Sequence, residues 1–208
     1  MQERRREAVV RRFGRAFLLL VILALIVLVT IWAVPRRNSA PAEDSIEAGF
    51  ARDMAVHHAQ AVEMSEIIRQ RTDDSELRLL ATDITLTQQA QIGMISGWLA
   101  AWGLNQTRTG QPPMAWSGMS MPLGSKMPGI ASREDVASLK TLPLGEAERK
   151  YLQLMIAHHR AGVEMAKSAL KLQVRSPVDR FASSIVQSQQ AEIRTMTEML
   201  RLRSTLPS

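Results

Sequence analysis

Residues 54–64 read MAVHHAQAVEM, and residues 155–165 repeat the pattern as MIAHHRAGVEM. Shifting the chain against itself by 101 positions, without a gap, aligns residues 50–99 with residues 151–200 and gives 14 identities in 50 positions. All four histidines of the protein lie inside this repeat. Two copies at so long a period indicate an internally duplicated domain rather than a solenoid.

Each copy predicts a helical hairpin. Ser176 followed by Pro177 is typical of a helix start, because serine caps free amides and proline is tolerated at the first helical position, and Ser75 marks the equivalent start. The pattern predicts helices near residues 45–71, 76–102, 146–174 and 177–203, antiparallel within each pair because the turns are short.

A long crossover joins the two predicted hairpins. Residues 103–145 are rich in glycine and proline, and only Ser132–Asp135 resembles a short capped helix. Four helices with one long connection predict an all-α fold, a ferritin-like four-helix bundle over residues 44–203. The two repeats occupy about 50–102 and 146–203.

The amino-terminal segment differs from the rest of the chain. Residues 16–34 are uncharged and rich in Leu, Val and Ile, long enough to cross a hydrocarbon core of about 30 Å. Six arginines in the basic stretch 1–15 precede this predicted transmembrane helix, and two follow it at the start of the linker 35–43, which favours a cytoplasmic amino terminus and an extracytoplasmic domain. The alternative is a signal peptide cleaved near Ala42, giving a secreted protein.

Charge and composition exclude several classes of function. Residues 1–37 carry the whole net charge of +6, while residues 38–208 hold 18 basic and 18 acidic side chains, so the domain offers no surface typical of nucleic-acid binding. The absence of cysteine excludes disulfides, thiolate metal sites and cysteine nucleophiles. Only the 12 methionines and four histidines remain as ligands for a soft metal.

The repeated residues share one helix face. With about 100° per residue and Met54 at zero, His57, His58 and Met64 fall within about 80° of it, whereas Glu63 falls on the opposite side. The second copy repeats this arrangement, with Glu164 opposite. The candidate metal ligands are therefore Met54, His57, His58, Met64, Met155, His158, His159 and Met165.

The second helix of each copy carries polar residues on its apolar stripe. These are Gln88 and Gln91 in the first copy, and Gln189 and Glu192 in the second. A buried polar group without a hydrogen bond costs about 1 to 3 kcal/mol, and a ligand imidazole needs an acceptor for its other nitrogen. We therefore expect these four side chains to hold the histidines, with Met196 on the same stripe as a further ligand.

The crossover supplies four more methionines, Met114, Met119, Met121 and Met127. Such segments bind Cu(I) or Ag(I) through neutral thioethers, or they cover a hydrophobic groove, and the sequence leaves both open.

These motifs resemble the domain of unknown function 305 family, whose members are ferritin-like bacterial proteins, usually exported or membrane-anchored. The resemblance rests on the doubled Met-x-x-His-His motif with Met64 and Met165, the stretch Gln189–Ile193 followed by Met196, and Met127–Gly129, and it covers nearly all of residues 44–203. It implies little about activity, although some related proteins are periplasmic copper binders that use Met and His.

The sequence departs from the family pattern in the first copy. Ile95 stands where the family has a methionine, Met94 lies one position early, and Gln91 replaces an acidic residue; Ile130 also replaces a methionine after Met127–Gly129. We therefore expect the second copy to form the stronger site.

The leading interpretation is a membrane-anchored extracytoplasmic protein that binds a soft metal ion, Cu(I), and sequesters it or hands it over to a delivery partner. The alternatives are an interaction module without metal, whose crossover docks a partner, and a di-metal oxidoreductase. The last is disfavoured, because neither copy has the Glu-x-x-His pairing of hard-ligand bundles. No catalytic residue is evident, and the sequence does not indicate whether the protein is a homo-oligomer.

Overall fold

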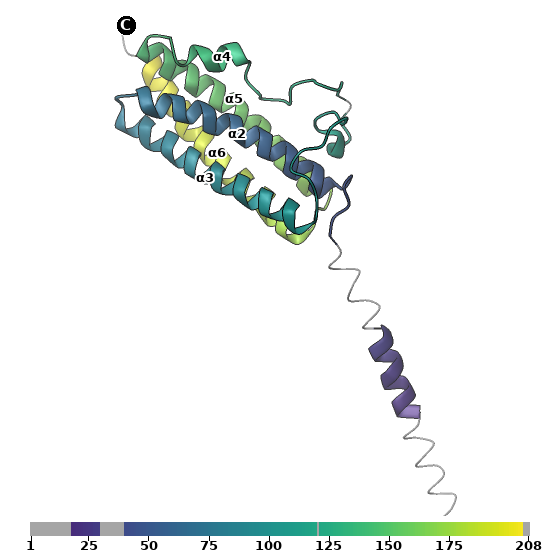
Figure 1. Ribbon diagram of the computed structural model, residues 1–208. Coiled ribbons are helices and arrows are strands. Elements are labelled where there is room, and N and C mark those ends of the chain that lie inside the picture. The colour runs from purple at the N-terminus through teal and green to yellow at the C-terminus, as the bar shows by residue number, and fades with distance from the viewer. Residues whose placement is uncertain (1–17, 30–39, 120, 206–208) are drawn as a thin grey trace, which may run out of the picture. The chain divides into compact units, whose positions relative to one another are not determined.

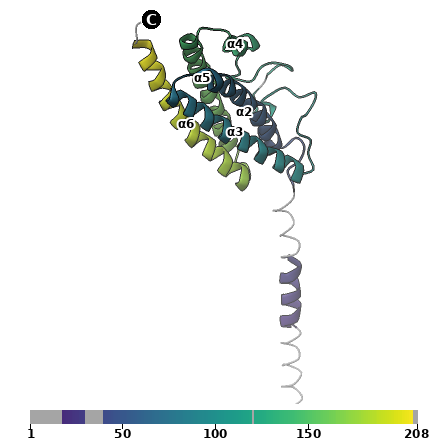
Figure 2. The ribbon, with the colours of Figure 1, turned by 60° about the vertical axis from the view of Figure 1, so that its left-hand side comes forward.

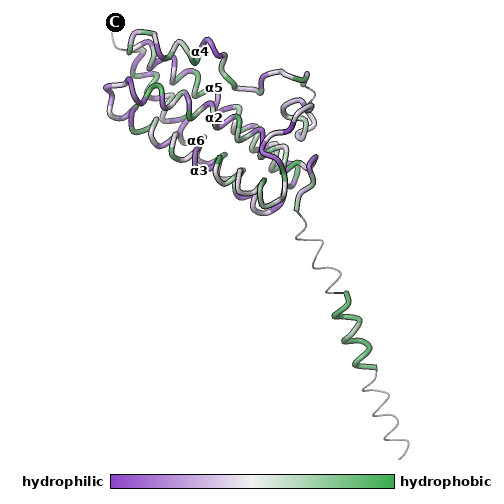
Figure 3. Tube along the Cα trace, viewed as in Figure 1, coloured by the Kyte–Doolittle hydropathy of each residue, from purple (hydrophilic) through white to green (hydrophobic). Residues whose placement is uncertain are grey.

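The computed structural model describes residues 18–29, 40–119 and 121–205. The chain divides into two units, residues 1–40 and residues 41–208. Residues 18–29 are helical and uniformly hydrophobic (Figure 3), but no helix within the described residues is both long and apolar enough to cross a membrane. The basic stretch 1–15, the ends of the expected span 16–34 and most of the linker lie outside the described residues.

The second unit is all-helical in its described part, with four long helices arranged as a bundle (Figures 1 and 2). These are α2 (Ile46–Arg71), α3 (Ser75–Ala101), α5 (Leu144–Lys171) and α6 (Ser176–Thr205). Short turns make α2 antiparallel to α3 and α5 antiparallel to α6, and α2 also packs along α5.

The helix ends differ slightly from the sequence-based expectation. Asp74, rather than Ser75, caps α3, because its carboxylate accepts from the amides of Glu76 and Leu77 at 2.9 and 3.1 Å. Helix α5 ends at Lys171, three residues early, since Gln173 takes a left-handed conformation with φ of 56°.

Polar side chains of α2 hold the crossover against the bundle. Arg52 donates to the Asn105 carbonyl at 2.9 Å. Gln60 exchanges two hydrogen bonds with the backbone of Ala131, at 2.8 and 3.1 Å. The crossover contains the expected capped helix, α4 (Arg133–Ser138), and a single 3-10 turn, η1 (Ala115–Ser117), which the sequence analysis did not predict.

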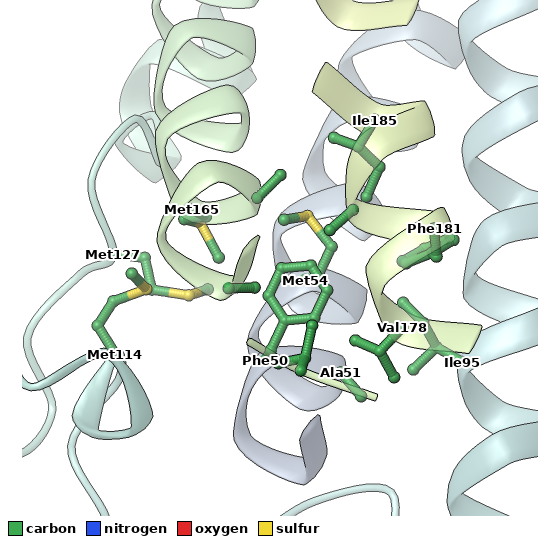
Figure 4. Close-up of a cluster of buried hydrophobic side chains, with 14 of the residues drawn as sticks. Phe50, Ala51, Met54, Ile95, Met114, Met127, Met165, Val178, Phe181 and Ile185 are labelled. Carbon is green, nitrogen blue, oxygen red and sulfur yellow. The ribbon is translucent and has the colours of Figure 1, made fainter. Parts of the chain in front are cut away.

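The core consists of two apolar clusters at opposite ends of the bundle. We call them the crossover-end cluster and the turn-end cluster. Figure 4 shows the first, which includes Phe50, Met54, Ile95, Met114, Met127, Met165, Phe181 and Ile185. The second includes Met64, Ile68, Leu77, Ile84, Tyr151, Leu152, Met155 and Met196.

The membership of these clusters fixes how α2 and α5 cross. Met54, near the start of α2, shares a cluster with Met165, near the end of α5, while Met64 and Met155 share the other. The two helices are therefore antiparallel, and each histidine pair lies between the clusters.

Gly129 brings the crossover into direct contact with α5. Its φ is +79°, and a Cβ there would lie 2.4 Å from the Ala161 Cβ and 3.2 Å from the His158 Cα. Gly124 has the same backbone conformation, with φ of +80°, but open space around it. We expect Gly124→Ala to lower the free energy of unfolding by about 1 to 2 kcal/mol through backbone strain alone.

Gly129→Ala should cost about 1 to 3 kcal/mol more than Gly124→Ala, because the new methyl group must displace α5 or the crossover. Urea denaturation of the two variants measures the difference. Equal losses would show that the crossover does not press on α5 at this point.

Candidate metal centre

A layer of polar side chains separates the two apolar clusters. We call it the polar layer, and each long helix contributes two residues to it. Its members are His57, His58, Gln88, Gln91, His158, His159, Gln189 and Glu192. The four histidines have no exposed surface, and Gln88 and Gln189 are buried as well. The sequence analysis predicted all eight of these residues to face inward.

The centre of the polar layer is the contact between the two repeats. The rings of His57 and His158 lie 3.7 Å apart between centroids, tilted by 33°. His158 Nε2 donates to the His57 carbonyl at 3.0 Å. The contact needs Gly162, because a Cβ there would lie 3.3 Å from His57 Cε1 and 2.5 Å from Gln189 Oε1. The glycine thus leaves room for the imidazole and amide groups.

His159 has a charged partner on α6. Its Nε2 donates to Glu192 Oε2 at 2.6 Å, and the glutamate side chain is 20% exposed. Met155 lies one turn before His159, and Met196 lies one turn after Glu192, so both thioethers flank this hydrogen bond on the same side. Both methionines belong to the turn-end cluster, as this spacing requires. These four residues form what we call the second quartet.

The first repeat contains the equivalent first quartet, Met54, His58, Gln91 and Ile95. Met54 and Ile95 meet in the crossover-end cluster, and Gln91 interacts with the His58 ring. The two quartets differ where the sequence departs from the repeat: an amide replaces the carboxylate, and Ile95 replaces Met196.

The polar layer holds ten buried side-chain nitrogen and oxygen atoms that have no hydrogen-bond partner among the described residues. They are both ring nitrogens of His57 and His58, Nδ1 of His158 and His159, and both amide atoms of Gln88 and Gln189. Each such atom costs about 1 to 3 kcal/mol when nothing pairs with it. In both His158 and His159, Nε2 has a hydrogen-bond partner and Nδ1 has none.

Burial keeps His57, His58 and His158 neutral. Desolvation, followed by the neighbouring His159, lowers the pKa of His57 to about 4. Desolvation and the neighbouring His57 lower the pKa of His58 to about 3, although Gln91 opposes the shift. The pKa of His158 also falls well below its ordinary value, through desolvation and then its imidazole neighbours. A neutral imidazole has a lone pair available for a metal ion.

The candidate methionines divide between the two ends of the bundle. Met155 and Met165 are ten residues apart on one helix, about 15 Å along its axis, so they cannot bind one ion together. Met54 and Met64 are separated in the same way. The structure instead groups Met64 with Met155 and Met196, and Met54 with Met165. Helical angles alone could not reveal this exchange between repeats.

The crossover methionines occupy different environments. Met114 and Met127 are buried in the crossover-end cluster, Met121 packs against it, and Met119 is 45% exposed. Glu63 and Glu164 are exposed, as their angle predicted.

The sequence analysis missed Asp53. Its carboxylate accepts from the Met114 amide at 2.7 Å and from Trp116 Nε1 at 2.8 Å. Desolvation raises its pKa above the ordinary range, although both hydrogen bonds oppose the shift. Two features of the sequence could have indicated this contact: an acidic residue next to Met54, and Trp116 among the crossover methionines.

No group of three or more His, Asp or Glu side chains within the described residues is arranged to hold a metal ion. The donors that the polar layer and its flanks bring together are imidazoles and thioethers.

The buried histidines make stability depend on pH. Because folding lowers the pKa of His57 from 6.5 to about 4, the unfolded chain binds more protons between these values. The contribution of His57 to the free energy of unfolding is fully present above pH 6.5 and is lost as pH falls towards 4. The loss is on the order of 3 kcal/mol.

We expect the free energy of unfolding of the metal-free protein to fall steadily from pH 6.5 to 4, and His57→Gln to make this decline shallower. Urea denaturation at half-unit pH steps measures it. A flat profile in the unchanged protein would contradict the burial of neutral imidazoles.

Several solved structures resemble the chain. A DUF305 protein from Streptomyces coelicolor is 48% identical, with 80% of this chain and 99% of that chain covered and a TM-score of 0.73. A DUF305 fragment from Deinococcus radiodurans is 37% identical, covering 74% and 95%, with a TM-score of 0.64. CopM in its Cu(II)-bound form is 27% identical, covering 76% and 96%, with a TM-score of 0.59. No curated protein matches.

The sequence profile of the domain of unknown function DUF305 matches residues 47–200, which include both hairpins, the crossover and every residue of the polar layer. This range agrees with the resemblance seen in the two histidine motifs. The chain belongs to the DUF305 family.

Proposed function

We propose that the protein binds a soft metal ion, Cu(I), at the second quartet and either sequesters it or hands it over. The ligands are His159 Nδ1 and the thioethers of Met155 and Met196, with Met64 beside them. The observation that carries this proposal is the His159–Glu192 hydrogen bond, because it leaves Nδ1 of the same ring buried and without a partner, while Met155 and Met196 lie one turn away on the turn-end side.

The chemistry of these donors fits a monovalent soft ion. Thioethers and neutral imidazoles are preferred by Cu(I), whereas hard divalent ions prefer carboxylates and water. Thioethers remain neutral, so a site made from them adds no negative charge. A single ion charge can then be balanced by Glu192, the one carboxylate of the polar layer.

Glu192 also sets the orientation of the ligand. By accepting the Nε2 proton, it fixes the His159 tautomer with the lone pair on Nδ1 and increases the basicity of the ring. His158 has the same tautomer for a different reason, since its Nε2 donates to the His57 carbonyl. Its free Nδ1 makes it a second imidazole near the proposed ion.

The first quartet is the weaker partner in this proposal. Gln91 offers His58 an uncharged amide, and Ile95 removes one thioether. Met54 and His58 remain as ligands, with Met165 joining them from α5. His57, Gln88 and Gln189 complete the polar layer that both quartets share.

The likeness to CopM supports the choice of metal. That protein is known in a Cu(II)-bound form and, at 25% identity to this chain, in a Cu(I)-bound form. The ferritin-like arrangement of the bundle fits the proposal too, since such bundles build metal sites from inward side chains of facing helices.

We further propose that binding takes place outside the cytoplasm, in a protein held at the membrane by residues 16–34. The support is the sequence: an uncharged span preceded by six arginines and followed by two. A reporter enzyme that is active only outside the cytoplasm should be active when fused after Ser208. An inactive fusion would reject this placement.

Loss of the Glu192 charge should weaken copper binding without unfolding the protein. We expect Glu192→Gln to raise the Cu(I) dissociation constant about 10- to 100-fold and His159→Ala to raise it further. Anaerobic competition with a chromophoric chelator measures both. Glu164→Gln is the matched control. It removes the same charge from α5, but Glu164 is exposed and pairs with Lys167 at 2.8 Å instead of a histidine. Equal affinity in all variants would favour a histidine layer that only packs the bundle.

The duplication also allows a gain-of-function test. Gln91→Glu combined with Ile95→Met gives the first quartet the donors of the second. We expect this double variant to bind Cu(I) more tightly at the first quartet, by about tenfold or more, which the same competition resolves as a second tight equivalent. An unchanged titration would mean that these two differences do not set the asymmetry.

A further inference from the structure

Four of the protein's methionines meet beneath the crossover. Met54 comes from α2, Met165 from α5, and Met114 and Met127 from either side of η1. All four are buried. Figure 4 shows Met165 beside Met127 and Met114, and Met54 on the other side of the cluster, towards Ile185. Their neighbours in this cluster are apolar.

From this arrangement we infer a second soft-metal site, built from thioethers alone, which binds a monovalent ion such as Cu(I) or Ag(I) through Met114, Met127, Met165 and Met54. We call it the crossover site. It rests on the proposed function only for the class of metal, since it uses none of the residues of the second quartet. It shares Met54 and Met165 with the weaker site at the first quartet, so only one of those two sites holds an ion at a time.

The backbone at Met114 argues against simple core filling. Met114 has a φ of 62°, a left-handed conformation that costs a residue with a side chain about 1 to 2 kcal/mol. Asp53 holds it there by accepting from the Met114 amide, while the same oxygen accepts from Trp116 Nε1. A half-buried carboxylate therefore maintains a strained turn whose effect is to point Met114 into the cluster. Apolar packing alone requires neither strain nor a desolvated acid.

The internal duplication offers a second argument. At the turn end, the bundle helices provide three buried thioethers, Met64, Met155 and Met196, and the partly buried Met199 packs against them. At the crossover end, the helices provide only Met54 and Met165, because Ile95 stands at the third position. The crossover occurs once in the chain and adds Met114 and Met127 at this end alone. The end that lacks the helical methionine thus receives two from the crossover.

The surroundings select the charge of the ion. The donors in the cluster are thioethers, and the neighbouring Asp53 carboxylate already accepts from the Met114 amide and Trp116 Nε1, so the site favours a soft monovalent ion, which gains from polarisable sulfur. Of the four methionines, Met127 is the most exposed, at 7%. A surface groove of about 550 Å³ is lined by Met127 together with Asp53 and Gln60, and it opens beside Leu123 and Lys126.

The test is nuclear magnetic resonance of the full-length protein carrying ¹³C-methyl methionine, titrated with Ag(I) at pH 7 and assigned with single Met→Leu variants. We expect the methyl signals of Met114, Met127 and Met165 to shift in proportion to added metal. Met114→Leu with Met127→Leu should lose about one equivalent of bound Ag(I), since Leu keeps the volume but not the sulfur. The control is Met94→Leu with Met119→Leu, which removes two exposed thioethers and should lose none.

The signals separate the two proposals. Shifts at Met155 and Met196 with none at Met114 and Met127 overturn the crossover site and leave the second quartet standing. Shifts at Met114 and Met127 alone support the crossover site and reject the second quartet. If the Leu double variant folds, as judged by its circular dichroism, yet binds as much Ag(I) as the control, the crossover methionines only pack the core.

Discussion

The structure depends on one constraint: four imidazoles and two amides are buried between two apolar clusters in the middle of a helical bundle. The contact between His57 and His158 sets this layer, because it joins the two repeats where α2 and α5 cross. The layer is costly for a metal-free fold, since ten of its polar atoms have no partner among the described residues. A bound ion offsets such a cost by pairing with nitrogen lone pairs.

The duplication explains why the bundle holds two similar but unequal quartets. An antiparallel crossing brings the start of each histidine helix against the end of the other, so each end of the bundle receives methionines from both repeats. The turn end keeps the carboxylate and the methionine of α6. The crossover end has Gln91 and Ile95 at the equivalent positions of α3. The crossover covers this end with its own methionines, Met114 and Met127. The two ends thus differ in charge and in donor type, although their helices are related by repetition.

Much of this arrangement could be predicted from the sequence, and the reasons are local. The period of 101 residues identified two hairpins, and helical angles placed His57, His58 and their copies on the inner face. The grouping of Met165 with Met54 could not be predicted, because spacing within a helix fixes a face and not the partner helix. The hydrogen bonds from Met114 and Trp116 to Asp53 could not be predicted for a similar reason, since nothing in the sequence fixes the left-handed turn at Met114. The expected membrane span is only partly described, so it remains a prediction.

The central claim is that imidazole and thioether donors in this bundle hold a soft monovalent ion. X-ray absorption at the copper edge, on the full-length protein loaded with one equivalent of Cu(I), tests it most directly. We expect a shell that contains both sulfur and imidazole nitrogen, with a smaller nitrogen contribution in His159→Ala. A shell of nitrogen and oxygen alone, or failure to retain the copper against a chelator, would contradict it.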